Sequence, residues 1–442
     1  MFYIALAVAK CVDLCIKALR LGAGSTWPGE VALRIDPHFI RNALTLNKLP
    51  SLIIAGTNGK TTTSLLVAHG LRKKDKKVIT NPEGANLLNG VASTLVKNST
   101  VSGRIDADYA LFESDENALV GILSEVINPK VVAVLNLFRD QLDRYGEVHV
   151  IAKKWKDTLS HLSNSTQLIC NGDDPILAHL GSLAPSVSYF GASKEEKTSQ
   201  DLTHDVDSIH CPQCGSPLVY TAISYSHLGD FTCRSCNFIT PQNKHAETYK
   251  DLPHFKGTYN KYNLRAAIEV LSCVLSIDRN DVYQLLTDTL PAFGRQEKIM
   301  YKGKQWIIIL SKNPAGFNQS IAALSEILNN TPTSILIVLN DRIPDGTDVS
   351  WIWDVEFDRL YKNAEKIFIS GDRTFDMAIR METASGVESQ KSKAVRLHTE
   401  ESLVKMVEHI SINHATQSPI VVLATYTGVL EVRKILTGRA LL

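Results

Sequence analysis

Residues 51–64, SLIIAGTNGKTTTS, constrain the fold more than any other segment of this chain. The apolar run 52–55 predicts a strand, residues 56–59 predict a glycine-rich turn, and an amphipathic helical pattern follows from residue 60. Where such a turn opens a helix, backbone N–H groups and the helix dipole converge on an anion. The segment therefore predicts an α/β unit with a phosphate-binding loop.

The residue types in this loop indicate ATP with a magnesium ion. The lysine of such a loop reaches the β/γ-phosphate oxygens and the next hydroxyl binds Mg²⁺, positions that Lys60 and Thr61 hold here. The general pattern has a glycine where this chain has Ile54, so the turn is a shorter GxxGKT variant. A chance Gly-Lys-Thr is the alternative, which the flanking strand and helix patterns disfavour. The loop residues expected to contact ATP are Gly56, Thr57, Asn58, Gly59, Lys60, Thr61 and Thr62.

Composition indicates a chain of several domains with little net charge. At 442 residues, a prior of about 150 residues per domain predicts around three units. The net charge of +1 gives no global field that would attract nucleic acid or an anionic membrane. The cationic run 72–77 lies at the end of the first predicted helix, where cations suit the dipole, so we expect a solvated helix end.

The first 20 residues combine apolar composition with helical periodicity. Lys10, Asp13 and Lys17 interrupt the segment, which lacks a basic leader and a cleavage site and is too short to span a bilayer. We expect a cytoplasmic chain whose amphipathic N-terminal helix docks on its own core, with contact at the membrane surface as the alternative. The apolar stripe of this helix comprises Ile4, Val8, Cys11, Cys15 and Leu19.

Four of the eight cysteines form two CxxC pairs separated by 18 residues. This spacing is typical of a tetrahedral Cys₄ zinc ribbon, and four thiolates leave no open position for water, so the predicted zinc is structural. Polar segments flank the pairs, which indicates an insertion within a larger domain. The predicted ligands are Cys211, Cys214, Cys233 and Cys236, whereas we expect ordinary buried thiols at Cys11, Cys15, Cys170 and Cys273.

Polar side chains follow two further predicted strands, residues 109–112 and 131–135. In an open α/β sheet, ligands bind at the carboxyl ends of the strands. Carboxylates there suit Mg²⁺ beside a nucleotide, so we expect Glu113 to join Thr61 as a magnesium ligand. The polar residues at these strand ends are Glu113, Asn136, Asp140 and Asp143.

Five motifs in this order resemble the Mur ligase family. They are GTNGKTT, the acidic strand end at residue 113, the segment NLFRDQLDRYGE, the helix start NKYNLRAA and the turn FGRQE. Mur ligases are ATP-dependent amide-forming enzymes that build peptidoglycan stem peptides, and folylpolyglutamate synthases are related to them. The resemblance spans nearly the whole chain, and it implies that Asn260, Asn263 and Arg295 also contact ATP.

The resemblance is strongest to the branch of this family that amidates lipid II together with a GatD-like glutaminase. The phosphate loop begins only about 55 residues into the chain, which leaves no room for the family's UDP-sugar domain. The Cys₄ insertion and the stretches KNPAGFNQS and LNDRIPDGTDVSWIWD also match that branch. The resemblance implies that Asp348 is supplied in a heterodimer to the catalytic site of the glutaminase.

Three departures from the family pattern concern a second metal ion. Gln141 stands where many members have a metal-binding histidine, and Lys312-Asn313-Pro314 replaces His-Asn-Pro. No lysine matches the carbamylated one securely, although Lys154 and Lys156 are both near its place. These departures leave a second Mg²⁺ site unassigned and do not affect ATP binding.

From about residue 300, apolar strand patterns alternate with helical ones, including a helix expected at 318–328. This predicts a second, Rossmann-like domain of four or five strands. The loop 340–354 follows the predicted strand 335–339 and contains two tryptophans and four aspartates. We expect Trp351 and Trp353 to be partly exposed anchors for another protein, with core packing as the alternative.

The predicted architecture is α/β with three parts. An N-terminal helix and lead-in (1–48) precede a Mur ligase-like central ATP-binding domain (49–298), which carries the zinc-ribbon insertion at about 205–245. A Rossmann-like C-terminal domain with a partner-facing loop completes the chain (299–442).

The family resemblance implies the chemistry. Transfer of the γ-phosphoryl group of ATP to the α-carboxylate of D-glutamate in lipid II gives an acyl phosphate, and ammonia then forms D-isoglutamine. No cysteine has the setting of a nucleophile, so a partner glutaminase is expected to supply the ammonia, at the inner face of the membrane.

Two alternatives remain open at this point. A folylpolyglutamate-synthase-like ligase would share the phosphate loop but has no evident need for the zinc ribbon or the Asp348 loop. A zinc-ribbon, ATP-dependent nucleic-acid-binding regulator would bind in a strongly salt-dependent way, which the near-neutral charge disfavours.

Overall fold

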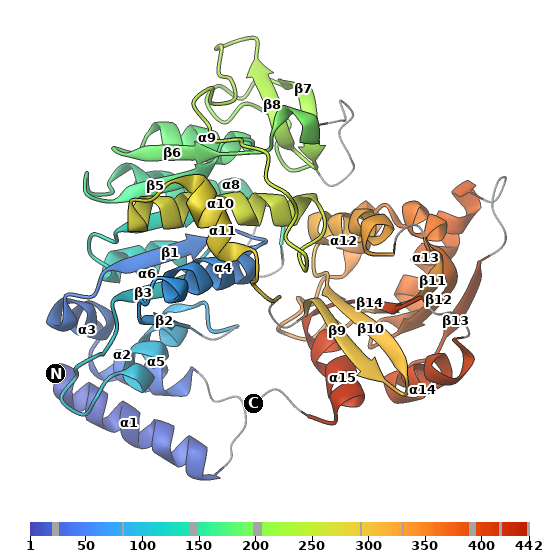
Figure 1. Cartoon of the computed structure of the whole chain (residues 1–442), viewed down its shortest axis with the longest axis horizontal. Helices are drawn as coiled ribbons and strands as arrows, with labels where there is room; N and C mark the ends of the chain where they lie inside the picture. The colour runs from blue at the N-terminus through green and yellow to red at the C-terminus, as the bar shows by residue number, and fades with distance from the viewer. Residues whose placement is uncertain are drawn as a thin grey trace.

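The computed structural model describes residues 1–19, 26–81, 84–140, 148–197, 206–291, 294–328, 331–388, 395–414 and 418–439. Figure 1 shows two α/β units side by side, with a β-hairpin above the first unit and helix α1 at its outer edge. Within the described residues, no helix is both long and apolar enough to cross a membrane.

The first unit is built on a six-stranded parallel sheet in the order β2-β3-β1-β4-β5-β6. Strand β1 lies near the centre, between β3 and β4, and Ile54 aligns with both Glu113 and Ala133. The carboxyl ends of these three strands therefore meet at one edge, where α/β sheets bind ligands. The strands are β1 (Ser51–Ala55), β2 (Val78–Thr80), β3 (Tyr109–Ser114), β4 (Val131–Val134), β5 (Gln167–Asn171) and β6 (Val187–Phe190).

Helices cover both faces of this sheet because its buried strands present apolar residues alternately to each side. Ile53 and Val132 pack on one side, against α1 (Phe2–Leu19), α2 (Trp27–Ile35), α3 (Phe39–Asn47), α5 (Leu88–Asn98), α6 (Leu119–Glu125), α8 (Val148–Ser160) and α9 (Pro175–Ser182). Leu52 and Ile54 pack on the other side, against α4 (Lys60–Lys73), α10 (Thr258–Leu275) and α11 (Arg279–Leu286).

The N-terminal helix exists as predicted, but it docks through a different face. Ala5, Leu6 and Ala9 are fully buried, and α1 packs against α2. The two alanines are small, which allows the helices to lie close together. The expectation that the stripe from Ile4 to Leu19 covers the core is wrong, since every residue of that stripe is exposed. Cys11 and Cys15 are accordingly exposed thiols rather than buried ones, while Cys170 is buried and Cys273 is half-buried.

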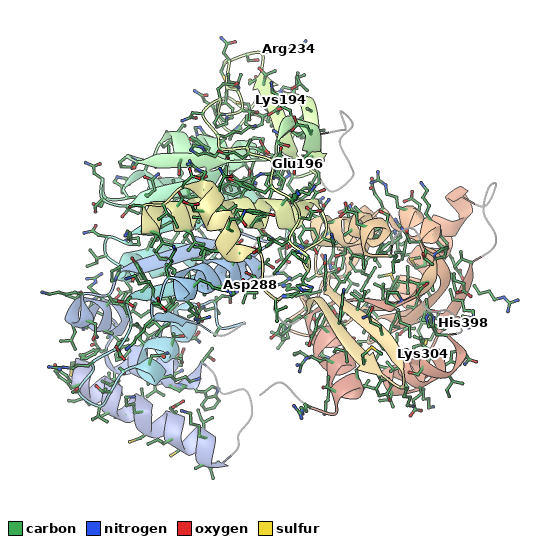
Figure 2. All side chains as sticks on the ribbon, viewed as in Figure 1. Lys194, Glu196, Arg234, Asp288, Lys304 and His398 are labelled. Atoms are coloured by element: carbon green, nitrogen blue, oxygen red, sulfur yellow. The ribbon has the colours of Figure 1, made fainter. Side chains whose placement is uncertain are left out.

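The cysteine-bearing hairpin consists of β7 (Leu218–Tyr225) and β8 (Leu228–Cys233), which are antiparallel. Its tip enters the first unit, where Tyr225 and Leu228 join the core beneath α10. The short 3₁₀ helix η1 (Lys194–Glu196) lies at the junction, and Figure 2 shows Glu196 between the hairpin and α10. Glu196 forms an ion pair with Arg265 of α10 at 2.6 Å, and next to η1 Lys197 pairs with Asp230 of β8 at 2.7 Å. The hairpin is thus anchored to the sheet unit by both apolar and ionic contacts.

The second unit has a six-stranded sheet in the order β13-β12-β11-β14-β10-β9, in which only β9 is antiparallel to its neighbour. The sheet has more strands than the four or five predicted. The sequence pattern did not reveal β13, because this strand is short and largely polar. The boundary expected between 298 and 299 falls inside β9. The strands are β9 (Arg295–Tyr301), β10 (Lys304–Leu310), β11 (Thr333–Val338), β12 (Ala364–Ser370), β13 (Arg396–Thr399) and β14 (Ile420–Ala424).

The helices of the second unit include α12, which begins at Pro314 rather than at residue 318. Asn313 caps it by accepting a hydrogen bond from the Gly316 N–H at 2.8 Å, and proline is favourable in the first turn. The helical elements are α12 (Pro314–Ile327), α13 (Thr374–Glu388), α14 (Leu403–Asn413), α15 (Tyr426–Thr437), η2 (Ser350–Asp354) and η3 (Phe357–Lys362).

Candidate active site

The phosphate loop joins β1 to α4 in a conformation that requires glycine. Gly59 has φ +87°, in the left-handed region, and a Cβ there would lie 2.0 Å from Asn263 Oδ1. Gly56 has φ +141°, and its Cβ would lie 3.0 Å from the Asn136 carbonyl oxygen. The close approach of α10 and of the segment after β4 therefore leaves no space for side chains at either glycine.

Residues that follow β4 hold the loop from beneath. The Asn58 N–H donates to Asn136 Oδ1 at 2.8 Å, and the Asn136 side-chain amide donates back to the Asn58 carbonyl at 3.0 Å. Thr57 Oγ1 accepts from the Phe138 N–H at 3.0 Å and lies 3.2 Å from the Phe138 carbonyl. The backbone of the loop is thus fixed before any ligand binds.

Lys60 folds back over this loop. Its ammonium donates to the carbonyls of Gly56 at 2.5 Å and Thr57 at 3.0 Å, and it lies 3.5 Å from Glu116 Oε2. Burial raises the pKa of Glu116, and the nearby charge of Lys60 opposes that rise only in part. A lysine whose closest partners are neutral carbonyls is well placed to accept an anionic partner.

Thr61 and Glu113 come together as the sequence predicts. The Thr61 hydroxyl donates to Glu113 Oε2 at 3.0 Å, across the carboxyl edge of the sheet. Both side chains offer oxygen atoms as metal ligands, which is the ligand type that a hard cation such as Mg²⁺ prefers. Asp143 and Gln141 lie outside the described residues, whereas Lys154 and Lys156 are exposed on α8 and do not line the cavity described next.

A cavity of about 330 Å³ lies between the two units and above the phosphate loop. It contains the predicted residues from Thr57 to Thr61, together with Glu113 and Arg295, which the second unit contributes from the start of β9. Gly56, Thr62, Asn260 and Asn263 are not among the residues that line it. The complete lining is Thr57, Asn58, Gly59, Lys60, Thr61, Gly84, Asn86, Leu87, Glu113, Asp115, Asp140, Arg295, Leu310, Lys312, Gly316, Pro344 and Tyr426.

Asn260 and Asn263 lie behind the loop on α10. Both side chains are buried, and the Asn263 amide donates to Asn260 Oδ1 at 3.2 Å. Because Asn263 occupies the space where Gly59 would carry a Cβ, its contact in this structure is with the protein loop itself. Its observed role is therefore to support the turn.

Sequence reasoning missed the pairing of Lys312 with Asp140, although it noted Lys312 as a departure from the family pattern. The Lys312 ammonium contacts Asp140 Oδ2 across 172 residues of chain. Burial lowers the pKa of Lys312, but the Asp140 and Glu116 carboxylates outweigh it and raise that pKa overall. The sequence offers one indication of this pairing, which is that Lys312 replaces the histidine of the family's His-Asn-Pro motif.

Asp348 lies on the long loop after β11, outside the cavity described above. Its carboxylate is exposed and accepts a hydrogen bond from the Ser350 N–H at 2.8 Å. It lines a second cavity of about 110 Å³ that also contains Asp140 and Lys312. Of the two predicted anchors, Trp353 is 53% exposed, whereas Trp351 is half-buried against Phe317.

The four cysteines of the CxxC pairs gather at the end of the hairpin. Their sulfur atoms all lie within 4.8 Å of one another, as four ligands of one ion would. Hydrogen bonds from Ser216, from its backbone first, lower the pKa of Cys214 to about 6. The geometry and the thiol donor set therefore fit a closed metal site, which would be structural.

Comparison with known proteins assigns the chain to a family. Residues 54–271 match the Mur ligase middle domain, and residues 310–429 match the MurT ligase C-terminal family. The lipid II isoglutaminyl synthase (glutamine-hydrolyzing) subunit MurT of Streptococcus pneumoniae is 31% identical, over 95% of this chain and 94% of its own. The chain belongs to the MurT family of Mur ligases. As a MurT-family protein it is an ATP-dependent ligase with an ATP-binding middle domain.

Solved structures of MurT-related folds agree with this assignment. A pseudomurein peptide ligase type C from Methanothermus fervidus superposes with a TM-score of 0.61 at 21% identity, covering 88% of this chain and 78% of that one. A Mycobacterium tuberculosis folylpolyglutamate synthase complexed with ADP gives a TM-score of 0.60 at 13% identity, covering 95% and 99%. These likenesses show a shared fold, whereas the sequence match to MurT decides between the two ligase alternatives and against a nucleic-acid regulator.

Proposed function

We propose that this chain is the ligase subunit of a glutamine-hydrolysing lipid II isoglutaminyl synthase. It would amidate the α-carboxylate of D-glutamate in the lipid II stem peptide during peptidoglycan biosynthesis. The observation that carries the proposal is the match to a MurT subunit over 95% of the chain. The gathering of Lys60, Thr61 and Glu113 in one cavity supports it chemically.

The residues of the cavity would promote phosphoryl transfer to a carboxylate. A carboxylate is a poor electrophile, and its conversion to an acyl phosphate supplies a good leaving group. Lys60 would exchange its bonds to the Gly56 and Thr57 carbonyls for a phosphate oxygen, which is a stronger, charged acceptor. Thr61 and Glu113 would hold Mg²⁺, and the bound ion neutralises charge on the phosphates. Arg295 adds a second cation from the opposite wall.

The Cys₄ cluster would hold a structural Zn²⁺. Four sulfur donors at the end of a hairpin, none of them in the cavity lining, support a folding role rather than a catalytic one. The metal would stabilise the hairpin whose tip reaches the core of the first unit.

The nitrogen donor would be ammonia from a GatD-like glutaminase partner in a heterodimer. Asp348 is exposed, lies on a loop at the carboxyl end of β11, and is flanked by the exposed Trp353, features that suit a docking surface. At this surface its carboxylate would orient a histidine of the partner, as the third member of a Cys-His-Asp set.

The experiment that tests this proposal compares two nitrogen sources in the purified complex. Asp348→Asn keeps the size of the side chain but removes the charge that holds the imidazole tautomer, so glutamine-dependent amidation should fall by about 10⁴-fold. Amidation driven by ammonium salts should be largely retained, because the ATP cavity does not include Asp348. Equal loss with both sources, or equal retention, would contradict the role of Asp348.

A further inference from the structure

Two cavities meet at one partly buried ion pair, Lys312 with Asp140. The cavity above the phosphate loop and the smaller cavity beside Asp348 both count Asp140 and Lys312 among their lining residues. Asp140 follows β4 in the first unit, and Lys312 follows β10 in the second. The pair therefore forms the wall between the ligase cavity and the side of the molecule that carries Asp348.

One carboxylate oxygen of Asp140 accepts no hydrogen bond from the described residues. Its side chain is only 2% exposed, and Oδ2 faces the Lys312 ammonium. Its other oxygen, Oδ1, is buried and has no hydrogen-bond partner among the described residues. Because buried polar atoms are almost always paired in folded proteins, an unpaired carboxylate oxygen at the junction of two cavities indicates a ligand that donates hydrogen bonds.

We propose that Asp140 is the ammonia-binding residue of this enzyme, at the junction through which ammonia enters the ligase cavity. The proposal rests on the proposed function, because it takes ammonia from the Asp348 side and uses it in the cavity that contains Lys60. Ammonia is a small molecule with three N–H donors, and it matches an acceptor enclosed between two cavities. Lys312 closes the junction in this structure, and an anionic phosphate in the ligase cavity would compete for its ammonium.

Amide formation needs an acceptor for one proton of ammonia. The nitrogen lone pair of ammonia forms the C–N bond to the acyl carbon, and the C–O bond to phosphate breaks with its electron pair on the leaving oxygen. The nitrogen then carries one proton too many for an amide, and Asp140 Oδ1 accepts it. The released phosphate takes that proton from Asp140, which restores the carboxylate for the next turnover.

The test uses the whole complex and three variants. Asp140→Asn retains the shape but cannot accept a proton, and Asp140→Glu retains the carboxylate. The matched control is Asp288→Asn, because Asp288 also pairs with a lysine, Lys73, and with His69 at 2.9 Å, but lines neither cavity. The measurements are glutamate released, amide formed, ADP formed with lipid II, and the KM for ammonium.

We expect Asp140→Asn to release glutamate and form ADP while amide formation falls by about 100-fold, the scale of one proton-transfer group. Its KM for ammonium should rise, Asp140→Glu should recover part of the loss, and Asp288→Asn should behave as the wild type. An unchanged KM for ammonium, or the same loss in Asp288→Asn, would overturn the proposal. Absence of any amide from the wild type with either nitrogen source would instead overturn the proposed function.

A second, independent observation concerns the outer face of α1. The exposed residues of this helix are Met1 beside its start, then Tyr3, Ile4, Ala7, Val8, Cys11, Leu14, Cys15, Lys17, Ala18 and Leu19. Only one of them is charged, and it is a cation. Asp13 is buried and pairs with Lys17 at 2.6 Å, so the face exposes no carboxylate. Trp27, at the start of the neighbouring α2, is 67% exposed.

We propose that this face rests on the cytoplasmic surface of a lipid bilayer. An apolar helix face with one lysine and nearby aromatic residues, and without exposed acids, matches the interface of a lipid membrane. Helix α1 lies at the outer edge of the molecule in Figure 1. The substrate named for the MurT relatives is a lipid, which explains why such a ligase would bind at a bilayer.

Sedimentation of the complex with vesicles tests this surface. The wild type should bind vesicles of phosphatidylcholine with phosphatidylglycerol, and the double variant Ile4→Glu, Leu14→Glu should not. Ile412→Glu is the matched control, because Ile412 is an exposed residue of α14 on the other unit and its change should leave binding intact. Failure of the wild type to bind, or a double variant that instead loses self-association or its glutaminase, would overturn the proposal.

Discussion

At the scale of residues, the active site combines groups that the sequence identifies with groups that only the fold brings together. Lys60, Thr61 and Glu113 were identifiable because each follows a strand in a recognisable local pattern. Glu116 was not, because its importance depends on complete burial next to Lys60, to which no local pattern points. Burying the charged form of this carboxyl group costs free energy of folding.

Glu116 should therefore make stability depend on pH. Burial raises its pKa in the folded chain above the value near 4.5 that it has when unfolded. The folded state then binds more protons than the unfolded state, so this group costs stability as pH rises from about 4 towards neutrality. Glu116→Gln should raise the Tm at pH 7 by a few degrees and have little effect at pH 4, as measured by calorimetry without nucleotide.

The control for this prediction is Glu408→Gln, since Glu408 is exposed on α14. A Glu116→Gln variant that melts earlier than the wild type at pH 7 would show that the Lys60 contact outweighs burial. Whether Glu116→Gln raises or lowers the Tm, it should reduce ligase activity if the Glu116 carboxylate positions Lys60.

At the scale of elements, the hairpin is tied to the phosphate loop by a short series of contacts. His227 at the hairpin tip is fully buried and its ring lies 4.9 Å from that of Phe138, centroid to centroid. The backbone of Phe138 in turn bonds Thr57 of the loop. The inserted hairpin therefore supports the nucleotide site from behind, and its stability bears on the site.

Metal analysis of the reduced protein tests the zinc assignment. One Zn²⁺ per chain is expected in the wild type, and none in the double variant Cys211→Ser, Cys214→Ser. Because metal binding contributes folding free energy, that variant should melt earlier, by on the order of 10 °C. Cys11→Ser, Cys15→Ser is the control, since both thiols are exposed on α1. A wild type free of zinc, or a variant that retains it, would rule out the ribbon.

At the scale of the whole molecule, the two units meet through polar contacts that join distant segments. Asn58 of the phosphate loop donates to Asn313 Oδ1 at 3.3 Å, and Arg139 pairs with Asp354 at 3.3 Å. Such contacts place Arg295 and Lys312 opposite Lys60 and so complete the cavity. The site belongs to the interface between the units rather than to either unit alone.

Much of this architecture could be predicted from local patterns, and the remainder could not for identifiable reasons. The central strands, the phosphate loop and the cysteine hairpin each carry a strong local signal, and all appear where expected. The docked face of α1 was predicted wrongly because close packing selects the small residues Ala5 and Ala9, whereas hydrophobicity alone favours the Ile4 stripe. The Lys312–Asp140 pair was missed because it joins residues 172 positions apart.

The most direct test of the central claim is mass spectrometry of lipid II after incubation with the purified chain, ATP, Mg²⁺ and an ammonium salt. We expect an amide at the α-carboxyl of D-glutamate, formed by the wild type and reduced by about 100-fold or more in a folded Lys60→Ala variant. A folded Lys60→Ala variant that amidates lipid II at a near wild-type rate would contradict the account.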